Sequence, residues 1–160
     1  MAHKTHDHVI LVPVDFSVDS EEALIYAVTL AEALKTPLLV LHVVHDPGSA
    51  PGYYAVKGRN KQLRRLEDVA AELLGEFLDK EKKKHPGHAV LDEAVTELVI
   101  GLPVNRILET ARKRHARMIV MGSQGRTGLA HALLGSKAEQ VVRLSPIPVT
   151  IVKAKKKERS

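Results

Sequence analysis

The sequence contains no cysteine, and this absence excludes disulfide bonds, thiolate metal sites and thiol catalysis. Tryptophan is also absent and other aromatic residues are few, which argues against a surface on which nucleic-acid bases stack. No apolar run approaches the roughly 20 residues of a membrane-spanning helix, and the N-terminus lacks the apolar segment of a signal peptide. We therefore expect a cytoplasmic protein in a reducing compartment, with no membrane partner.

The net positive charge of the chain is concentrated at its C-terminal end. The formal net charge is +5, and residues 153–160 supply +4 of it through four lysines, one arginine and one glutamate. The rest of the chain is therefore nearly neutral, and a basic surface built into the fold is not expected. This distribution argues against a nucleic-acid partner.

The length of 160 residues suits one domain, which would bury roughly 70% of the surface of its unfolded chain. We expect a single domain over residues 1–160. Its folded core should span about residues 8–153, between a short polar N-terminus and a basic C-terminal tail.

Short apolar runs alternate with amphipathic segments along the chain. Strands are expected at residues 9–12, 38–44, 90–100, 118–121 and 149–152. Helices are expected after a cap at Ser17 or Asp19, along the stripe 63–78, from Pro103, and over 137–143. This alternation implies parallel strands joined by right-handed crossovers, and so an α/β fold with helices on both faces of a sheet.

The segment after the fourth expected strand carries the strongest functional signal. It holds four glycines and then a serine and a lysine, namely Gly122, Gly125, Gly128, Gly135, Ser136 and Lys137. Glycine lets the backbone approach a ligand and turn N–H groups toward an anion. Ser136 and Glu139 have capping-box spacing, which predicts a helix start whose N–H groups and dipole favour a phosphate. On these residues alone, a phosphate site and ordinary turns are equally good interpretations.

The spacing of Gly122, Gly125 and Gly135 before Ser136 resembles the nucleotide-binding signature of the ATP-binding branch of the universal stress protein family. Four further segments are similar to that family at corresponding places: residues 9–20, 41–43, 118–122 and 146–152. The resemblance covers about residues 8–153. It implies an open, Rossmann-like five-stranded parallel sheet in the order 3-2-1-4-5, with nucleotide held at the carboxyl ends of strands one and four.

The resemblance also implies roles for individual residues. Asp15 would meet the ribose or the metal–phosphate region. The adenine slot and the nucleoside would be flanked by Pro13, Val43, Met121 and Gly122. The phosphates would be surrounded by Gly125, Arg126, Gly135, Ser136 and Lys137. The implied cofactor is ATP with Mg²⁺ or Mn²⁺ on its phosphates, and no protein metal ligand is assigned beyond Asp15 acting through water or the phosphate-bound ion.

Histidines and two tyrosines have other interpretations. His42 lies inside an apolar strand and is expected to be buried and hydrogen-bonded rather than catalytic. A functional metal site at His3, His6 and His8 is not expected, because chain ends are usually mobile. For Tyr53 and Tyr54 a lid over the nucleotide and plain mobility both stay open.

The resemblance implies a nucleotide-responsive regulator in the stress response. Two subunits would form a homodimer through the edge of the fifth strand. A protein partner that the sequence does not identify would recognise the nucleotide-bound form. The P-loop pattern GxxxxGK[ST] is missing, and Asp15 is the only obvious carboxylate at the site. No catalytic residue and at most weak ATPase activity are therefore expected. A slow ATP hydrolase and an interaction protein that binds no nucleotide remain as alternatives.

Overall fold

The computed structural model describes residues 8–45, 66–125 and 134–155. Strands and helices alternate in it as β1 (Ile10–Pro13), α1 (Val18–Leu34), β2 (Leu38–Val44), α2 (Leu66–Lys84), α3 (Ala89–Asp92), β3 (Val95–Ile100), α4 (Pro103–Lys113), β4 (Met118–Gly122), α5 (Ser136–Leu144) and β5 (Val149–Val152). The predicted second and fifth strands have the bounds that the sequence indicated.

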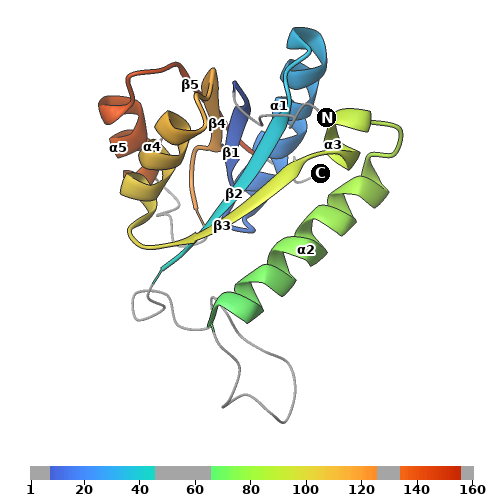
Figure 1. The fold of residues 1–160 in the computed structure, drawn as a ribbon, viewed down its shortest axis with the longest axis horizontal. Helices are drawn as coiled ribbons and strands as arrows, with labels where there is room; N and C mark the ends of the chain where they lie inside the picture. Colours follow the sequence, from blue (N-terminus) through green and yellow to red (C-terminus); the bar gives the residue numbers. More distant parts are fainter. Residues whose placement is uncertain (1–7, 46–65, 126–133, 156–160) are drawn as a thin grey trace, which may run out of the picture.

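The five strands form one parallel sheet in the order β3-β2-β1-β4-β5 (Figure 1). β1 lies in the centre, where Ile10 pairs with Leu38 of β2 on one side and with Met118 of β4 on the other. β3 and β5 are the two edge strands. The predicted fold class and strand order are confirmed.

Helices cover both faces of the sheet, with α1, α2 and α3 on one face and α4 and α5 on the other (Figure 1). Successive residues of the central strands enter opposite cores. Ile10 and Val12 pack with α1 and α2, whereas Leu11 packs with α4 and α5. Because both faces are covered, these strands have nearly unbroken apolar sequences.

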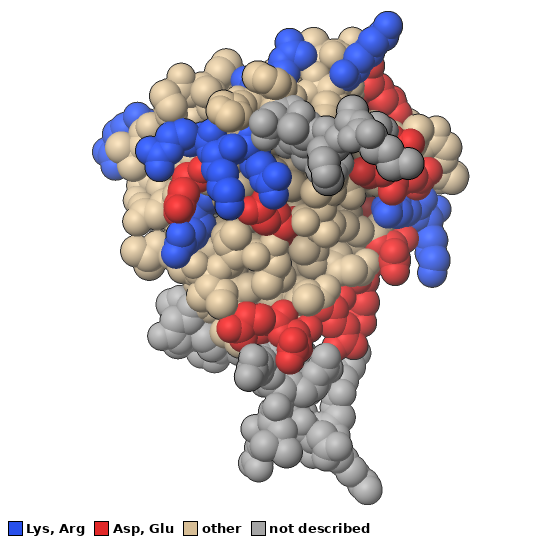
Figure 2. All heavy atoms as spheres, in the orientation of Figure 1, with Lys and Arg blue, Asp and Glu red and all other residues tan. Residues whose placement is uncertain are grey.

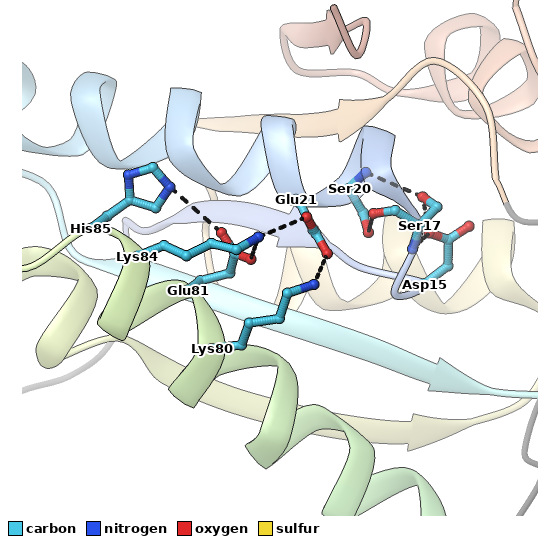
Figure 3. Close-up of polar contacts among 8 residues, drawn as sticks. All are labelled: Asp15, Ser17, Ser20, Glu21, Lys80, Glu81, Lys84 and His85. Atoms are coloured by element: carbon cyan, nitrogen blue, oxygen red, sulfur yellow. Dashed lines mark hydrogen bonds and ion pairs between the residues drawn. The ribbon is translucent and has the colours of Figure 1, made fainter. Parts of the chain in front are cut away.

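A network of charged side chains joins α2 to the first turns of α1 (Figure 3). Glu21 accepts hydrogen bonds from Lys80 at 2.6 Å and Lys84 at 3.4 Å. Glu81, which is 1% exposed, pairs with Lys84 at 3.3 Å and lies 3.7 Å from His85. Partial burial raises the pKa of Glu21, but the hydrogen bond and charge of Lys80, with those of Lys84, outweigh it and leave this pKa below its ordinary value.

The third strand is shorter than the sequence predicted. Residues 90–100 were expected to be extended, but Ala89–Asp92 forms the short helix α3. The amides of Leu91 and Asp92 both donate to the carbonyl of His88. The pairing of β3 with β2 begins at Val95, opposite Leu39, so the residues before it have no strand partner there and close a helical turn instead.

Charges of both signs occupy the face shown in Figure 2. Lysine and arginine side chains gather over the side of α4 and α5, whereas acidic side chains follow the beginning of α2. This face is therefore not a continuous basic surface of the kind that binds nucleic acid. In the part of the chain that the structure describes, none of the helices has the length and apolar character needed to cross a bilayer.

Candidate functional site at the ends of β1 and β4

The candidate site lies where the order of the strands reverses. From β1 the chain continues to β2 on one side, while β4 lies on its other side, so the carboxyl ends of β1 and β4 form the switch point of the sheet. In open α/β sheets ligands bind in the crevice at this place. Asp15 follows β1 by two residues and Gly122 ends β4, so both come to this edge.

Asp15 is held by the turn that leads into α1 (Figure 3). Its Oδ1 accepts hydrogen bonds from the amide of Ser17 at 3.1 Å and from the Ser17 hydroxyl. The Ser17 Oγ in turn accepts from the amide of Ser20 at 3.2 Å, so the predicted cap at Ser17 is confirmed. One carboxylate oxygen is thereby fixed, while Oδ2 of Asp15 faces Gly125.

The three glycines of the signature are sites of close packing. A β-carbon added at Gly122 would stand 2.7 Å from Asp19 Cβ and 2.8 Å from the Asp19 backbone carbon, and one added at Gly125 would stand 2.5 Å from Asp15 Oδ2. At Gly135 it would stand 3.0 Å from the carbonyl oxygen of Ser123. Contacts below 3.0 Å are nearly unknown for real β-carbons. The ends of β1, β4 and α5 therefore converge because these positions have no side chain.

Asp19 joins three segments at this edge, a role that the sequence did not indicate. Its Oδ2 accepts from the Ser123 hydroxyl at 2.7 Å and from the amide of Gln124 at 3.0 Å. Its Oδ1 accepts from the amide of Ala154, just after β5, at 3.3 Å. Asp19 was expected to serve only the start of α1, because partners more than 100 residues away leave no local signal. It is a second carboxylate at the site, but its oxygens bind the chain itself.

The start of α5 differs by one residue from the prediction. Gly135, with φ −66° and ψ 153°, is the N-cap, and Ser136 is the first residue of the helix rather than its cap. The predicted capping box is therefore wrong. The amide of Gly135 donates to the Ser123 carbonyl at 2.6 Å, which turns the chain into the helix one residue early. Ser136 and Lys137 thus lie exposed in the first turn, where N–H groups have no partner within the helix.

The other predicted contacts surround this junction or fall outside the described residues. Pro13 is half-buried at the end of β1. Val43 and Met121 are buried in the core beneath α4 and α5, at the same end of the sheet. Five predicted residues lie outside the described ranges, namely Arg126, Tyr53, Tyr54, His3 and His6.

His42 lies directly beneath the β1–α1 turn and is 1% exposed. Its Nδ1 donates to the carbonyl of Val14 at 2.7 Å, and its ring stacks on Phe16 with 4.4 Å between centroids. Burial lowers the pKa of His42, which keeps the ring neutral near pH 7. The prediction of a buried, hydrogen-bonded histidine is confirmed. Phe16 has φ 66°, a left-handed backbone that costs a residue with a side chain of the order of 1–3 kcal/mol.

Comparison with known proteins agrees with this geometry. The model of the Universal stress protein family matches residues 8–153. The chain belongs to this family. It is 36% identical over 149 residues to universal stress protein MJ0531 of Methanocaldococcus jannaschii, covering 93% of this chain and 84% of that protein. It also resembles the solved structure of MJ0577, from the same organism, with a TM-score of 0.66 and 26% identity over 96% of this chain and 99% of that one.

Two solved universal stress proteins with the same fold carry nucleotides. One is a complex with cAMP, with a TM-score of 0.64 and coverage of 92% of this chain and 98% of that chain. The other, from Archaeoglobus fulgidus, is a complex with dAMP, with a TM-score of 0.55 and coverage of 91% and 97%. Each is 23% identical to this chain, so each likeness concerns the fold.

Gly122→Ala should destabilise the protein by about 1–3 kcal/mol, because the new methyl group meets the backbone of α1 rather than a movable side chain. Gly75→Ala is the matched control, since Gly75 lies in α2 with nothing within 4 Å of the added carbon and alanine favours a helix by about 0.5–1 kcal/mol. Urea unfolding of both variants measures the difference. Equal stability of the Gly122→Ala variant and the parent would contradict the close packing described above.

Proposed function

We propose that this protein binds ATP, with Mg²⁺ or Mn²⁺ on its phosphates, at the junction of β1, β4 and α5, and that it acts as a nucleotide-responsive dimeric regulator in the stress response. The observation that carries the proposal is the convergence of Gly125 and Gly135 with Asp15 at the first turn of α5. The cAMP and dAMP complexes of proteins with the same fold support the choice of an adenine nucleotide.

The phosphate end of the nucleotide fits the start of α5. A β-carbon at Gly135 would stand 3.9 Å from the backbone nitrogen of Gly125, so two stretches of bare backbone lie side by side. The adjacent helix terminus offers N–H groups and the positive end of its dipole, which favour an anion. Lys137 lies exposed in the same turn and adds a positive charge. These features together suit a polyphosphate better than a neutral ligand.

The divalent cation would be held mainly by the phosphates. Across the described segments, no three acidic or histidine side chains come together as a metal site. Asp15 is the carboxylate placed to reach the ion or its water, because its Oδ2 faces the glycine segment. Oxygen ligands with several retained waters are what Mg²⁺ prefers. The residues present therefore fit a nucleotide-borne cation.

A regulatory role is favoured over hydrolysis by the way the second carboxylate is used. Asp19 accepts from Ser123, Gln124 and Ala154, which fits a structural link better than the positioning of a water. The same link ties the segment after β4 to the end of β5. Binding of nucleotide next to Gly125 would thus change the conformation of the edge strand β5. A second subunit or a partner protein that binds this edge would respond to the change.

Gly125→Val and Gly135→Val should each weaken ATP binding by at least about 10-fold, because a branched side chain fills the space that backbone and phosphate would share. Gly75→Val is the matched control, since the same change there meets open space. Titration calorimetry with ATP and Mg²⁺ gives the affinities, and nucleotide released from denatured, freshly purified protein identifies the natural ligand.

Unchanged ATP affinity in both the Gly125→Val and the Gly135→Val variant would contradict the proposed nucleotide site. Hydrolysis is measured separately as phosphate release from bound ATP. Release that disappears in an Asp15→Ala variant while affinity persists would favour the slow hydrolase over the regulator. Absence of any ATP binding by the parent protein would favour an interaction protein that works without nucleotide.

The homodimer is proposed to form through β5. Among the residues that the structure describes, this strand pairs with β4 alone, which leaves backbone groups of its outer edge available for pairing. On the adjoining α5, Val142 and Leu144 are 44% and 56% exposed. Light scattering at micromolar concentration should give twice the chain mass of 17.6 kDa. A monomeric mass would refute this assembly.

A further inference from the structure

We propose that His42 positions Asp15 for the nucleotide, by fixing the backbone on both sides of it. The proposal rests on the function proposed above and adds a residue that would not itself touch the ligand. His42 belongs to β2, which is not one of the two strands whose ends form the switch point, so its part in the site is indirect.

The hydrogen bond of His42 fixes the residue before Asp15. The distance from Nδ1 to the Val14 carbonyl oxygen is 2.7 Å, and a carbonyl can only accept, so Nδ1 carries the proton. The Val14 carbonyl belongs to the peptide group that leads into Asp15. Holding this carbonyl therefore sets the orientation of the peptide from which the Asp15 side chain departs.

The ring of His42 fixes the residue after Asp15. It stacks on Phe16 with an interplanar angle of 29°, and Phe16 also packs against Phe77 of α2 at 5.7 Å. Phe16 has φ 66°, which a residue with a side chain adopts only when its surroundings hold it there. Stacking thus keeps the turn in the conformation that places Asp15 Oδ2 against Gly125.

A neutral imidazole suits both the hydrogen bond to Val14 and the stacking on Phe16. Burial is the main cause that lowers the pKa of His42, and the nearby His45 acts in the same direction, while the Val14 hydrogen bond and Asp15 act against it. The neutral ring with its proton on Nδ1 keeps one donor and a flat apolar face. The residue is thus suited to holding the turn and not to exchanging protons with a substrate.

Two variants separate the effect of the hydrogen bond to Val14 from the effect of the packed ring. His42→Phe keeps an aromatic ring but loses the donor to Val14, whereas His42→Asn places an amide N–H near the position of Nδ1 and keeps the donor. Val40→Ala is the control, because Val40 is fully buried on the same strand two residues earlier and contributes to the same core, but has neither a hydrogen-bond donor nor a ring in its side chain. Calorimetric ATP affinity, urea unfolding and amide chemical shifts of residues 15–17 are measured for all four proteins.

We expect His42→Phe to weaken ATP binding about 10-fold and to shift the amide signals of the turn. His42→Asn keeps the donor but loses the stacked ring, so it should recover part of that affinity, and Val40→Ala should lose stability without losing affinity. Equal affinity in the His42→Phe variant and the parent would overturn the proposal, and so would an equal loss in Val40→Ala. If the parent binds no ATP, the proposed function fails. Unchanged turn amides in the nucleotide-free His42→Phe protein would then overturn the positioning role by themselves.

Discussion

The candidate site depends on the contact between the end of β4 and the first turn of α1, which exists because Gly122 has no side chain. A β-carbon there would stand 2.7 Å from Asp19 Cβ, so any other residue would push the helix away from the strand. The approach brings the Asp19 carboxylate within reach of Ser123 and Gln124. The segment that carries Gly125 is therefore anchored where it leaves the sheet, next to Asp15.

Two further sets of contacts support this junction. On the side of α2, the pairs from Lys80 and Lys84 to Glu21 hold that helix against α1 (Figure 3). From beneath, His42 contacts the residues on either side of Asp15. The residues of the candidate site are thus held by packed strands and helices, which is the support that a precisely positioned binding site needs.

The sequence predicted the sheet well, because its physical signals are strong there. β2 is buried over its whole length, and its apolar run from Leu38 to Val44, interrupted only by His42, fixed both of its ends. The strand order came from the family resemblance and not from periodicity. The local sequence patterns that predicted where the third strand begins and which residue caps α5 were less reliable. Residues 90–92 formed a helical turn because β2 offers them no partner, and the predicted cap at Ser136 was wrong because Gly135 is bound to Ser123.

The sequence predicted the glycines and Asp15 as site residues, and the structure brings them close together, but the sequence indicated neither the role of Asp19 nor the partners of His42. Those interactions join residues that are distant along the chain, so no local spacing could reveal them. Nitrogen-15 NMR during a titration with ATP and Mg²⁺ tests the central claim most directly. Nucleotide bound at the junction of β1, β4 and α5 should give the largest amide shifts in residues 15–20, 122–125 and 135–138. Shifts confined to the outer side of α2 or to β3, with these residues unmoved, would contradict it.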